Sequence, residues 1–570
     1  MKKVLFKATV FALIITIILA TMPLYSYAAE SSFSNYEKAI DLKILGLLAN
    51  KPESFELGRT PNRIEGAIML VRLLGKEKQA IEIDYPHPFT DVPKWADHYV
   101  GYLYHSNLTK GIGNNRFGSY DSINANQYAT FVLRSIGYKD GLDFEYNNAL
   151  NKSKQIGMLD GTSYYSNTSI TSFNRNDMVG ISYNSLFVTL KNSGETLLDK
   201  LVNTDKAVNK TAARALRLYT GDLKDKLSGI ESYSPLVTDY GSLVKNSDDL
   251  FKLLRKAIFQ CTTPIKLDIK SYKGDIMADF NAAITAAIDV VTEVAGVDAP
   301  LLSWEYEKNS KTMTITLKYR YTKNSFATKR KQSTEALKTA RHIVAELIDS
   351  SMTDYSKEKI LHDYIINNTC YDYNNYIKGT LPDESFEEYG CLVSGKAVCE
   401  GYSEAMKLLC DLSGIECLIV TGKSLGSVED NHAWNIVKID GSYYHVDVTN
   451  DDPVSRDGAD ILAYYYFNHP DSQMAKVLKW DKSLYPRCNS NVNNYYYKNN
   501  LVVDSERSFE DLVRKAQKNG STSMEVAITN SFSSICNNLS DILFGNGITS
   551  YSFILHEELG VIKIYNVQYS

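Results

Sequence analysis

The stretch that decides the fold of the C-terminal half reads YGCLVSGKAVCEGYSEA and runs from Tyr389 to Ala405. After Cys399 and until Gly414, apolar side chains recur at helical spacing, at Tyr402, Met406, Leu409 and Leu412. The pattern predicts a helix that begins at Cys399, directly after a glycine-containing loop. The helix dipole and the free backbone N–H groups at such a position stabilise a thiolate, and the same N–H groups can form part of an oxyanion hole.

Three strands are predicted after this helix. Residues 416–421 form a short apolar run, and residues 431–439 and 442–449 alternate apolar and polar side chains on either side of Asp440-Gly441. An Asp-Gly pair between two such runs is a strong signal for a hairpin with a two-residue turn. The sequence therefore predicts an antiparallel hairpin over residues 431–449.

The register of this hairpin brings two polar side chains together. If Ile439 pairs with Ser442, His432 lies diagonally across from Asp447 on the same face of the sheet. Side chains in that relation have Cα atoms roughly 7–8 Å apart, close enough for an imidazole to hydrogen-bond a carboxylate. The hairpin thus predicts a His432–Asp447 pair.

A cysteine at a helix start, a histidine on a strand and an aspartate on the next strand are the parts of a nucleophilic triad. The sequence predicts Cys399 as the nucleophile, His432 as its base and Asp447 as the residue that orients the base. The alternative for Cys399 is a buried structural thiol. His445 points to the same face as Asp447 and is an alternative base, but His432 begins its strand at the expected edge of a cleft.

Three motifs around these residues resemble the transglutaminase-like superfamily, in its bacterial secreted branch. They read GxxVCEGYSEA at Cys399, NHAWN at His432 and YHVDVTxDDP at Asp447. The resemblance implies a papain-like α+β fold, acyl transfer through a cysteine, and no metal or organic cofactor. The family usually has an aromatic residue, most often Trp, where this chain has Asn450, and an amide at that position favours a wetter cleft.

Composition and charge narrow the class of protein. The chain has 570 residues, a net charge of −5 and no basic cluster, so nucleic acid is not an expected partner. Its eight Cys include no C-x-x-C pair, which fits neither a zinc site nor a dense disulfide scaffold. Residues 1–28 have a positive start, an apolar stretch and a small-x-small site before Ala29, which predicts a cleaved signal peptide. No later run approaches the roughly 18 apolar residues of a membrane span, so the mature chain is expected to be secreted without one.

Residues 33–195 contain three weakly similar units. Each combines a helix that ends in a glycine-containing turn, at Gly46, Gly111 or Gly157, with a second apolar helix that opens on a polar tetrapeptide. The tetrapeptides occupy residues 62–65, 124–127 and 174–177, and they are 62 and then 50 residues apart. Periods of this size indicate a repeat array.

These units resemble three S-layer homology modules, at residues 33–85, 86–143 and 144–195. The second unit opens with FTDVPKWA, and the tetrapeptides NRIE and NRND match the helix-start motif of the family. The resemblance implies an all-α anchor that binds a secondary cell-wall polymer, a pyruvylated polysaccharide, because an arginine at a helix start can pair with a carboxylate. It assigns polymer binding to Arg63, Glu65, Trp95, Arg175 and Asp177. In the second unit Ala125 and Gln127 replace the arginine and the acid.

The remaining segments complete a multidomain organisation. Residues 196–240 are polar and are expected to form a linker, and residues 241–330 show a helix and alternating strands. Residues 335–485 form the expected catalytic domain. Residues 500–570 repeat the pattern of 241–330, so two small α+β modules are expected to flank it.

The expected function is hydrolysis of a peptide or isopeptide bond at the cell wall or S-layer surface, on a protein or on a peptidoglycan peptide. Trp434 and Tyr402 are expected to line one wall of the cleft, and either Tyr371 or Tyr389 to donate to the oxyanion. Two alternatives stay open: a true transglutaminase that joins Gln and Lys side chains, and an inactive wall-binding or structural module.

Overall fold

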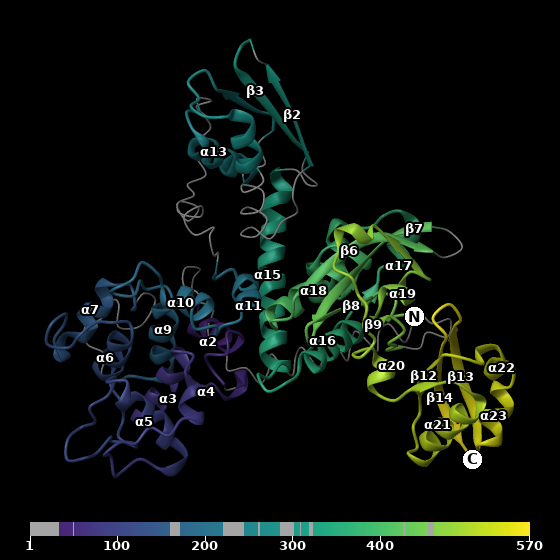
Figure 1. Cartoon of the computed structure of the whole chain (residues 1–570), viewed down its shortest axis with the longest axis horizontal. Coiled ribbons are helices and arrows are strands. Elements are labelled where there is room, and N and C mark those ends of the chain that lie inside the picture. The colour runs from purple at the N-terminus through teal and green to yellow at the C-terminus, as the bar shows by residue number, and fades with distance from the viewer. Residues whose placement is uncertain are drawn as a thin grey trace.

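The computed structural model describes residues 34–49, 51–159, 172–219, 244–259, 263–284, 301–307, 309–318, 323–425, 429–453 and 461–570. The expected signal peptide, residues 1–28, lies outside them. Figure 1 shows a helical N-terminal unit and a C-terminal module on opposite sides of a central domain. A third small module stands at the far end of the long helix α15 (Lys323–Leu347). Within the described residues, no helix combines the length and the apolar character that crossing a membrane requires.

Three equivalent helices form the centre of the N-terminal unit. They are α3 (Arg63–Leu73), α6 (Ala125–Ser135) and α9 (Arg175–Ser185), and they contact one another. Each begins with a capping box, in which the N-cap asparagine and the third helical residue bond each other's backbone N–H groups. The predicted helix starts at the three tetrapeptides are therefore confirmed.

The partner helices of the three units are α2 (Asn35–Ile44), α5 (Asp97–His105) and α7 (Ala149–Gln155), and α4 (Glu77–Glu82) follows α3. α2 and α7 run into the glycine turns that the sequence predicts, at Gly46 and Gly157, which both have positive φ. α5 differs, because the left-handed residue that ends it is Asn107, with φ 58°, and Gly111 lies further along the loop. Asparagine tolerates the left-handed conformation nearly as well as glycine, which is why the glycine pattern misplaced this helix end.

The segment that the sequence assigns to a linker, residues 196–240, contains two helices in its described part. α10 (Leu197–Asn203) buries Leu197 and Leu201, and α11 (Lys210–Ala215) follows it. Asn209, the N-cap of α11, donates its side-chain amide to the carbonyl oxygen of Gly414 at 3.1 Å. This segment therefore packs against the central domain instead of linking two units loosely.

A buried ionic contact joins α2 to the central domain. Arg341 of α15 lies 2.6 Å from a carboxylate oxygen of Asp41, and its guanidinium also donates to the backbone carbonyl of Glu37. His342 is 3.0 Å from the Glu37 carboxylate. The side chains of Arg341 and Asp41 are only 7% and 2% exposed, so this contact between α2 and α15 is shielded from solvent.

The central domain packs helices against one antiparallel sheet. α15 and α16 (Asp354–Asn368) both contact α18 (Cys399–Leu412), and α18 covers the sheet. The strand order is β10-β6-β7-β8-β9, from β6 (Cys417–Leu425), β7 (Glu429–Ile439), β8 (Ser442–Val446), β9 (Phe467–His469) and β10 (Leu478–Trp480). In the β7–β8 hairpin Ile439 pairs with Ser442 and Asn435 with Val446, so the predicted register is confirmed. The predicted strand 442–449 is too long, because β8 ends at Val446 and Asp447 lies just beyond it, before a turn.

Beside the helix start of α18 lies a second, very short sheet. β4 (Cys370–Tyr371) and β5 (Lys396–Ala397) pair in parallel, with Tyr371 opposite Ala397. α17 (Tyr373–Lys378) follows β4, and α18 follows β5 after Val398. The pairing brings Tyr371 beside the start of α18.

The two flanking modules share one topology. In the first, α13 (Ser247–Phe259) precedes the sheet β1-β3-β2, from β1 (Ile265–Asp268), β2 (Leu301–Glu307) and β3 (Thr312–Lys318). In the second, α21 (Glu506–Lys518) precedes β12-β14-β13, from β12 (Met524–Ile528), β13 (Ile548–His556) and β14 (Val561–Tyr569), with β11 (Val502–Val503) added at the edge. α22 (Phe532–Asn537) and α23 (Leu539–Gly545) complete this module. The strand order agrees with the similarity predicted between the two, although α15 begins at Lys323 and crosses the predicted boundary at residue 330.

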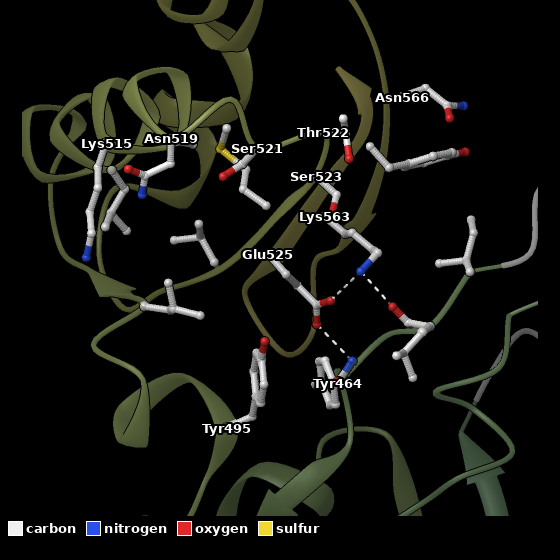
Figure 2. A pocket seen from close by; sticks show the side chains of 18 residues that line it. Tyr464, Tyr495, Lys515, Asn519, Ser521, Thr522, Ser523, Glu525, Lys563 and Asn566 are labelled. Carbon is white, nitrogen blue, oxygen red and sulfur yellow. Dashed lines mark hydrogen bonds and ion pairs between the residues drawn. The ribbon is translucent and has the colours of Figure 1, made fainter. Parts of the chain in front are cut away.

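Glu525 anchors the C-terminal module to the central domain (Figure 2). Its carboxylate accepts from the backbone N–H of Tyr464 at 2.9 Å and from the ammonium of Lys563 at 2.8 Å, and Lys563 also donates to the carbonyl of Leu462 at 2.7 Å. These groups line a cavity of about 580 Å³ between the two parts. Glu525 and Lys563 pair with each other within the C-terminal module, and each also bonds a backbone group of the central domain, so the cavity belongs to the docking of the module.

Candidate active site

Cys399 occupies the first position of α18 and is half-buried. Val398 precedes it in extended conformation and provides no side-chain cap, so the positive end of the helix is left to the thiol. Gly401 allows the loop before the helix to approach closely, since a Cβ there would lie 2.8 Å from the carbonyl oxygen of Ser385. The predicted placement of Cys399 at a helix start is confirmed.

His432 lies between Cys399 and Asp447. Its Nε2 is 2.7 Å from an Asp447 carboxylate oxygen, so this nitrogen carries the proton that the carboxylate accepts. The side chains of His432 and Asp447 are 9% and 0% exposed. A hydrogen bond with Cys399 helps to raise the pKa of His432, and it falls to the other ring nitrogen, Nδ1. The structure thus brings together the three residues that the sequence predicts.

The electrostatics favour a charged imidazole. Burial lowers the pKa of His432, but the charge of Asp447 and the hydrogen bonds to Asp447 and Cys399 outweigh burial and raise this pKa to about 10. An imidazolium that persists to such a pH stabilises a neighbouring thiolate. The three side chains can therefore hold a thiolate–imidazolium pair at neutral pH.

His445, the alternative base, belongs to a different network. Its Nδ1 accepts a hydrogen bond from the indole N–H of Trp434 at 2.9 Å, and its Nε2 lies 2.9 Å from Asp471. Trp434 in turn stacks on His432, with ring centroids 5.9 Å apart and an interplanar angle of 17°. His445 therefore supports the ring beneath His432 and does not reach Asp447.

His445, Asp471 and Cys488 form a cluster with the residue types of a metal site, since their ligand atoms lie within 4.8 Å of one another. The hydrogen bond from Trp434 to Nδ1 places the proton of a neutral His445 on Nε2, which is the nitrogen that faces Asp471. A metal would need a lone pair on that nitrogen. The contacts of His445 therefore fit a hydrogen bond to Asp471 better than a metal ligand.

Two aspartates of the DDP motif hold the turn after Asp447. Asp451 is fully buried, 3.1 Å from Nε2 of His362 on α16, and it also accepts from the backbone N–H of Tyr466 at 2.9 Å. Asp452 accepts a hydrogen bond of 2.6 Å from the hydroxyl of Tyr402, on the same helix as Cys399. These bonds tie the turn that carries Asp447 to two helices of the domain.

A buried asparagine fixes the nucleophile helix to the histidine strand. Asn435 is 1% exposed, and its side-chain amide donates to the carbonyl of Ser403 at 3.0 Å and to that of Leu418 at 3.3 Å. It thus bridges α18, β6 and β7. The NHAWN motif therefore contributes three functions: the base, the ring stacked on it, and this bridge.

The prediction that Trp434 and Tyr402 line one wall of the cleft is wrong. Trp434 and Tyr402 are 1% and 0% exposed and lie within the core of the domain. Trp434 is enclosed by Trp480, with ring centroids 5.8 Å apart, and by Gly422, whose missing side chain leaves room for the indole. A strand residue next to the catalytic cleft can face the core as easily as the cleft, and here the space beneath His432 is filled by the indole.

Tyr371 lies near Cys399. Burial, followed by the charges of Cys399 and Tyr376, raises the pKa of Tyr371, so that its hydroxyl stays a proton donor. Burial and the charges of Glu335 and Glu384 raise the pKa of Tyr389, and Cys399 makes no contribution there. Of the two candidates for the oxyanion donor, the structure brings only Tyr371 to the nucleophile.

The residues assigned to polymer binding lie in two different environments. Glu65 completes the cap of α3 and lies 3.4 Å from Arg175, so these two meet at the junction of the first and third units. Arg63 is 7% exposed, and its guanidinium lies over the rings of Phe117 and Phe131 at 5.1 and 4.9 Å. Asp177 is buried in the cap of α9, and Trp95 is 56% exposed. Glu65 and Arg175 are thus the members that meet.

Residues 341–448 match the family model described as the transglutaminase-like superfamily. The human kyphoscoliosis peptidase is 28% identical over 116 residues, which are 19% of this chain and 17% of that protein. A cell surface protein of Thermoanaerobacter kivui is 33% identical over 102 residues, 18% of this chain and 12% of that protein. The chain therefore spans less than a fifth of the length of these relatives.

A solved structure described as that of a TGase matches 37% of this chain and 60% of its own at 15% identity, with a TM-score of 0.19. The family match ends one residue after Asp447 and includes Cys399 and His432. Residues 341–448 form a transglutaminase-like domain.

Proposed function

We propose that this protein is a cysteine-nucleophile acyl-transfer enzyme that hydrolyses peptide or isopeptide bonds at a bacterial cell surface. The observation that carries the proposal is the position of His432, with Nε2 on Asp447 at 2.7 Å and the opposite ring nitrogen toward Cys399. A nucleophile, its base and the residue that orients the base are the parts that acyl transfer needs.

The proposed reaction uses these residues in two steps. The Cys399 thiolate attacks the carbonyl carbon of the substrate and forms a thioester, while the His432 imidazolium gives its proton to the leaving amine. In the second step His432 takes a proton from water, the hydroxide attacks the thioester, and Cys399 leaves as the thiolate. Asp447 keeps His432 in the tautomer and orientation that both steps require. The α18 N-terminus and the Tyr371 hydroxyl stabilise the oxyanion.

Water is proposed as the second nucleophile in preference to an amine. A transferase must protect its thioester from water, usually with aromatic walls. Trp434 and Tyr402 are buried and line no such wall. Tyr376 of α17, whose pKa Cys399 helps to raise, is 41% exposed, and Cys399 itself is only half-buried, so water can reach the nucleophile.

Wild-type protein should therefore hydrolyse a glutaminyl or wall-derived peptide faster than it couples the peptide to an amine. The measurement presents each peptide with an excess of labelled primary amine and follows released ammonia or cleaved product and incorporated label together. Cys399→Ala is the control for both channels. Incorporation that depends on Cys399 and exceeds hydrolysis would assign the protein to the transglutaminases.

The N-terminal unit is proposed to hold the protein to a secondary cell-wall polymer after secretion. The meeting of Arg175 with Glu65 at the junction of two units supports this, because a guanidinium held at a helix start can pair with an acidic sugar substituent. Arg59 lies beside the same Glu65 and is 41% exposed. These groups would meet a pyruvylated polysaccharide at the junction.

Arg175→Ala combined with Arg59→Ala should weaken co-sedimentation with purified Gram-positive walls by about ten- to a hundredfold, as expected for the loss of charged hydrogen bonds at the junction. Lys78→Ala is the matched control, because Lys78 is 86% exposed and lies outside the junction. Since the Arg175 side chain is only 12% exposed, a thermal unfolding curve of each variant separates lost binding from lost folding. Wild-type sedimentation of a folded double variant would remove these arginines from the proposed site.

A further inference from the structure

Asn450 contacts both oxygens of the Asp447 carboxylate. Its backbone N–H donates to Oδ1 at 3.2 Å, and its side-chain amide donates to Oδ2 at 2.7 Å. Oδ2 also accepts from Nε2 of His432 at 2.7 Å. The Asp447 side chain is fully buried, so these protein donors take the place of water around the carboxylate.

The orientation of the Asn450 amide follows from its neighbours. The amide nitrogen lies 3.3 Å from Nε2 of His432, and both nitrogens converge on the same oxygen of Asp447. If the amide were turned over, its oxygen would face the Asp447 carboxylate, and two acceptors would meet at hydrogen-bonding distance. The nitrogen is therefore the atom that faces the carboxylate.

Two donors from one residue fix the plane of the carboxylate. A carboxylate held at only one oxygen can turn about its Cβ–Cγ bond and carry the acceptor of His432 out of line. The backbone bond to Oδ1 and the amide bond to Oδ2 together prevent that rotation. An apolar side chain of the same size at position 450 would fill the space but leave Oδ2 with a single donor.

We propose that Asn450 is a positioning residue, which holds the Asp447 carboxylate in the plane that His432 requires. The proposal rests on the function proposed above, because it assigns Asn450 to the same reaction. Asn450 touches neither substrate nor Cys399 in this role. It acts through Asp447, and it stands at the position where the transglutaminase-like superfamily usually has an aromatic side chain.

The test compares Asn450→Leu and Asn450→Asp with wild type over a range of pH. Asn450→Leu keeps the volume and removes the donor, and kcat/KM for peptide hydrolysis should fall about ten- to a hundredfold, as expected for a hydrogen bond to a charged group. Asn450→Asp keeps the shape and can donate only while the new carboxyl is protonated. Its kcat/KM relative to wild type should therefore rise as the pH is lowered.

Asn367→Leu is the matched control. Asn367 is exposed on α16 and donates its amide to the Asp363 carbonyl within the same helix, so the same substitution there should leave the pH profile unchanged. The expected recovery of Asn450→Asp activity at low pH separates a positioning role from a structural one. If residue 450 only filled space or supported folding, the ratio of the variant's kcat/KM to that of wild type would stay constant with pH. A kcat/KM of Asn450→Leu within twofold of wild type, with a constant ratio for Asn450→Asp, would overturn the proposal.

A second readout keeps this test separate from the proposed function. The rate of Cys399 alkylation by iodoacetamide depends on the thiolate–imidazolium pair and needs no substrate. If wild type cleaves no peptide but its alkylation profile shifts in Asn450→Leu and not in Asn367→Leu, the hydrolase proposal fails and the role of Asn450 stands. If wild type cleaves peptide and neither readout changes in Asn450→Leu, the role of Asn450 fails and the hydrolase proposal stands.

Discussion

Replacing Cys399 by alanine should lower kcat for peptide hydrolysis by on the order of 10⁴- to 10⁶-fold, the range for loss of a triad nucleophile. The physical reason is that the thioester cannot form without the sulfur, while the oxyanion donors and substrate contacts remain. His432→Ala should cost a similar factor, and the double variant little more than either single one, because the residues act as a unit. The measurement is single-turnover cleavage of the peptide that wild type turns over best.

Cys370→Ser is the control for this prediction. Cys370 is an exposed thiol on β4, next to Tyr371 in the sequence, so it is an alternative nucleophile that reagents and substrates can reach. Its substitution should leave kcat within a fewfold of wild type. A Cys399→Ala variant that retains wild-type turnover, or a Cys370→Ser variant that loses it, would show that the wrong sulfur was chosen.

Asp451→Ala should destabilise the central domain by about 3–5 kcal/mol, the cost of removing one partner of a buried charge pair. The carboxylate is fully buried against His362 at 3.1 Å, and the backbone N–H of Tyr466 loses its acceptor as well. For a domain of this size the midpoint of thermal unfolding should fall by roughly 6–20 °C. Calorimetry or urea unfolding of the purified variant measures the effect.

The matched control is Asp354→Ala, which removes a carboxylate that is 44% exposed and lies 3.4 Å from Lys357. A surface pair of that kind contributes about 0–1 kcal/mol. If Asp451→Ala unfolds within 1 kcal/mol of wild type, the His362–Asp451 pair does not support the turn that carries Asp447.

The parts of the site that follow from local sequence could be predicted. The Asp440-Gly441 turn fixes the hairpin register, and the register fixes the pairing of His432 with Asp447. The helix start at Cys399 follows from apolar spacing and the glycine loop before it. In the N-terminal unit, the capping boxes could be predicted because both partners lie within three residues of each other.

The parts that depend on distant partners could not. His362 and Asp451 are 89 residues apart, and Tyr402 and Asp452 are 50 apart, so no local pattern pairs them. The exposure of Trp434 was predicted wrongly because alternation along a strand gives a face and not the neighbours on that face. The helix α10 was missed because its apolar residues stand among polar ones, although Leu197, Leu198, Leu201 and Val202 are all buried.

The contacts of Asn450 change the reading of its departure from the family pattern. From sequence, an amide in place of an aromatic ring indicates a wetter cleft. In the structure the Asn450 amide donates to the Asp447 carboxylate at 2.7 Å, on the side of His432 away from the nucleophile. The partial exposure of Cys399 and of Tyr376 on α17 now carries the argument for water as the acceptor.

The other thiols set the background for a direct test. Burial raises the pKa of Cys391 to about 12 and also raises those of Cys488 and Cys536, and a hydrogen bond to Cys417 together with burial raises that of Cys410. These thiols should react slowly at neutral pH. Among the described cysteines, Cys370 is then the exposed competitor, and Cys370→Ser removes it.

The most direct test of the central claim is the pH dependence of Cys399 alkylation by iodoacetamide, mapped by peptide mass, in wild type and in His432→Ala. A His432 pKa of about 10 means that the imidazolium is present at neutral pH and is lost only as the pH rises through about 10. Wild-type Cys399 should therefore label well below pH ~8.5, the value of a free thiol, and His432→Ala should move the profile up toward that value. Labelling of Cys399 only above pH ~8.5, unchanged by His432→Ala, would contradict the account of Cys399 as an activated nucleophile.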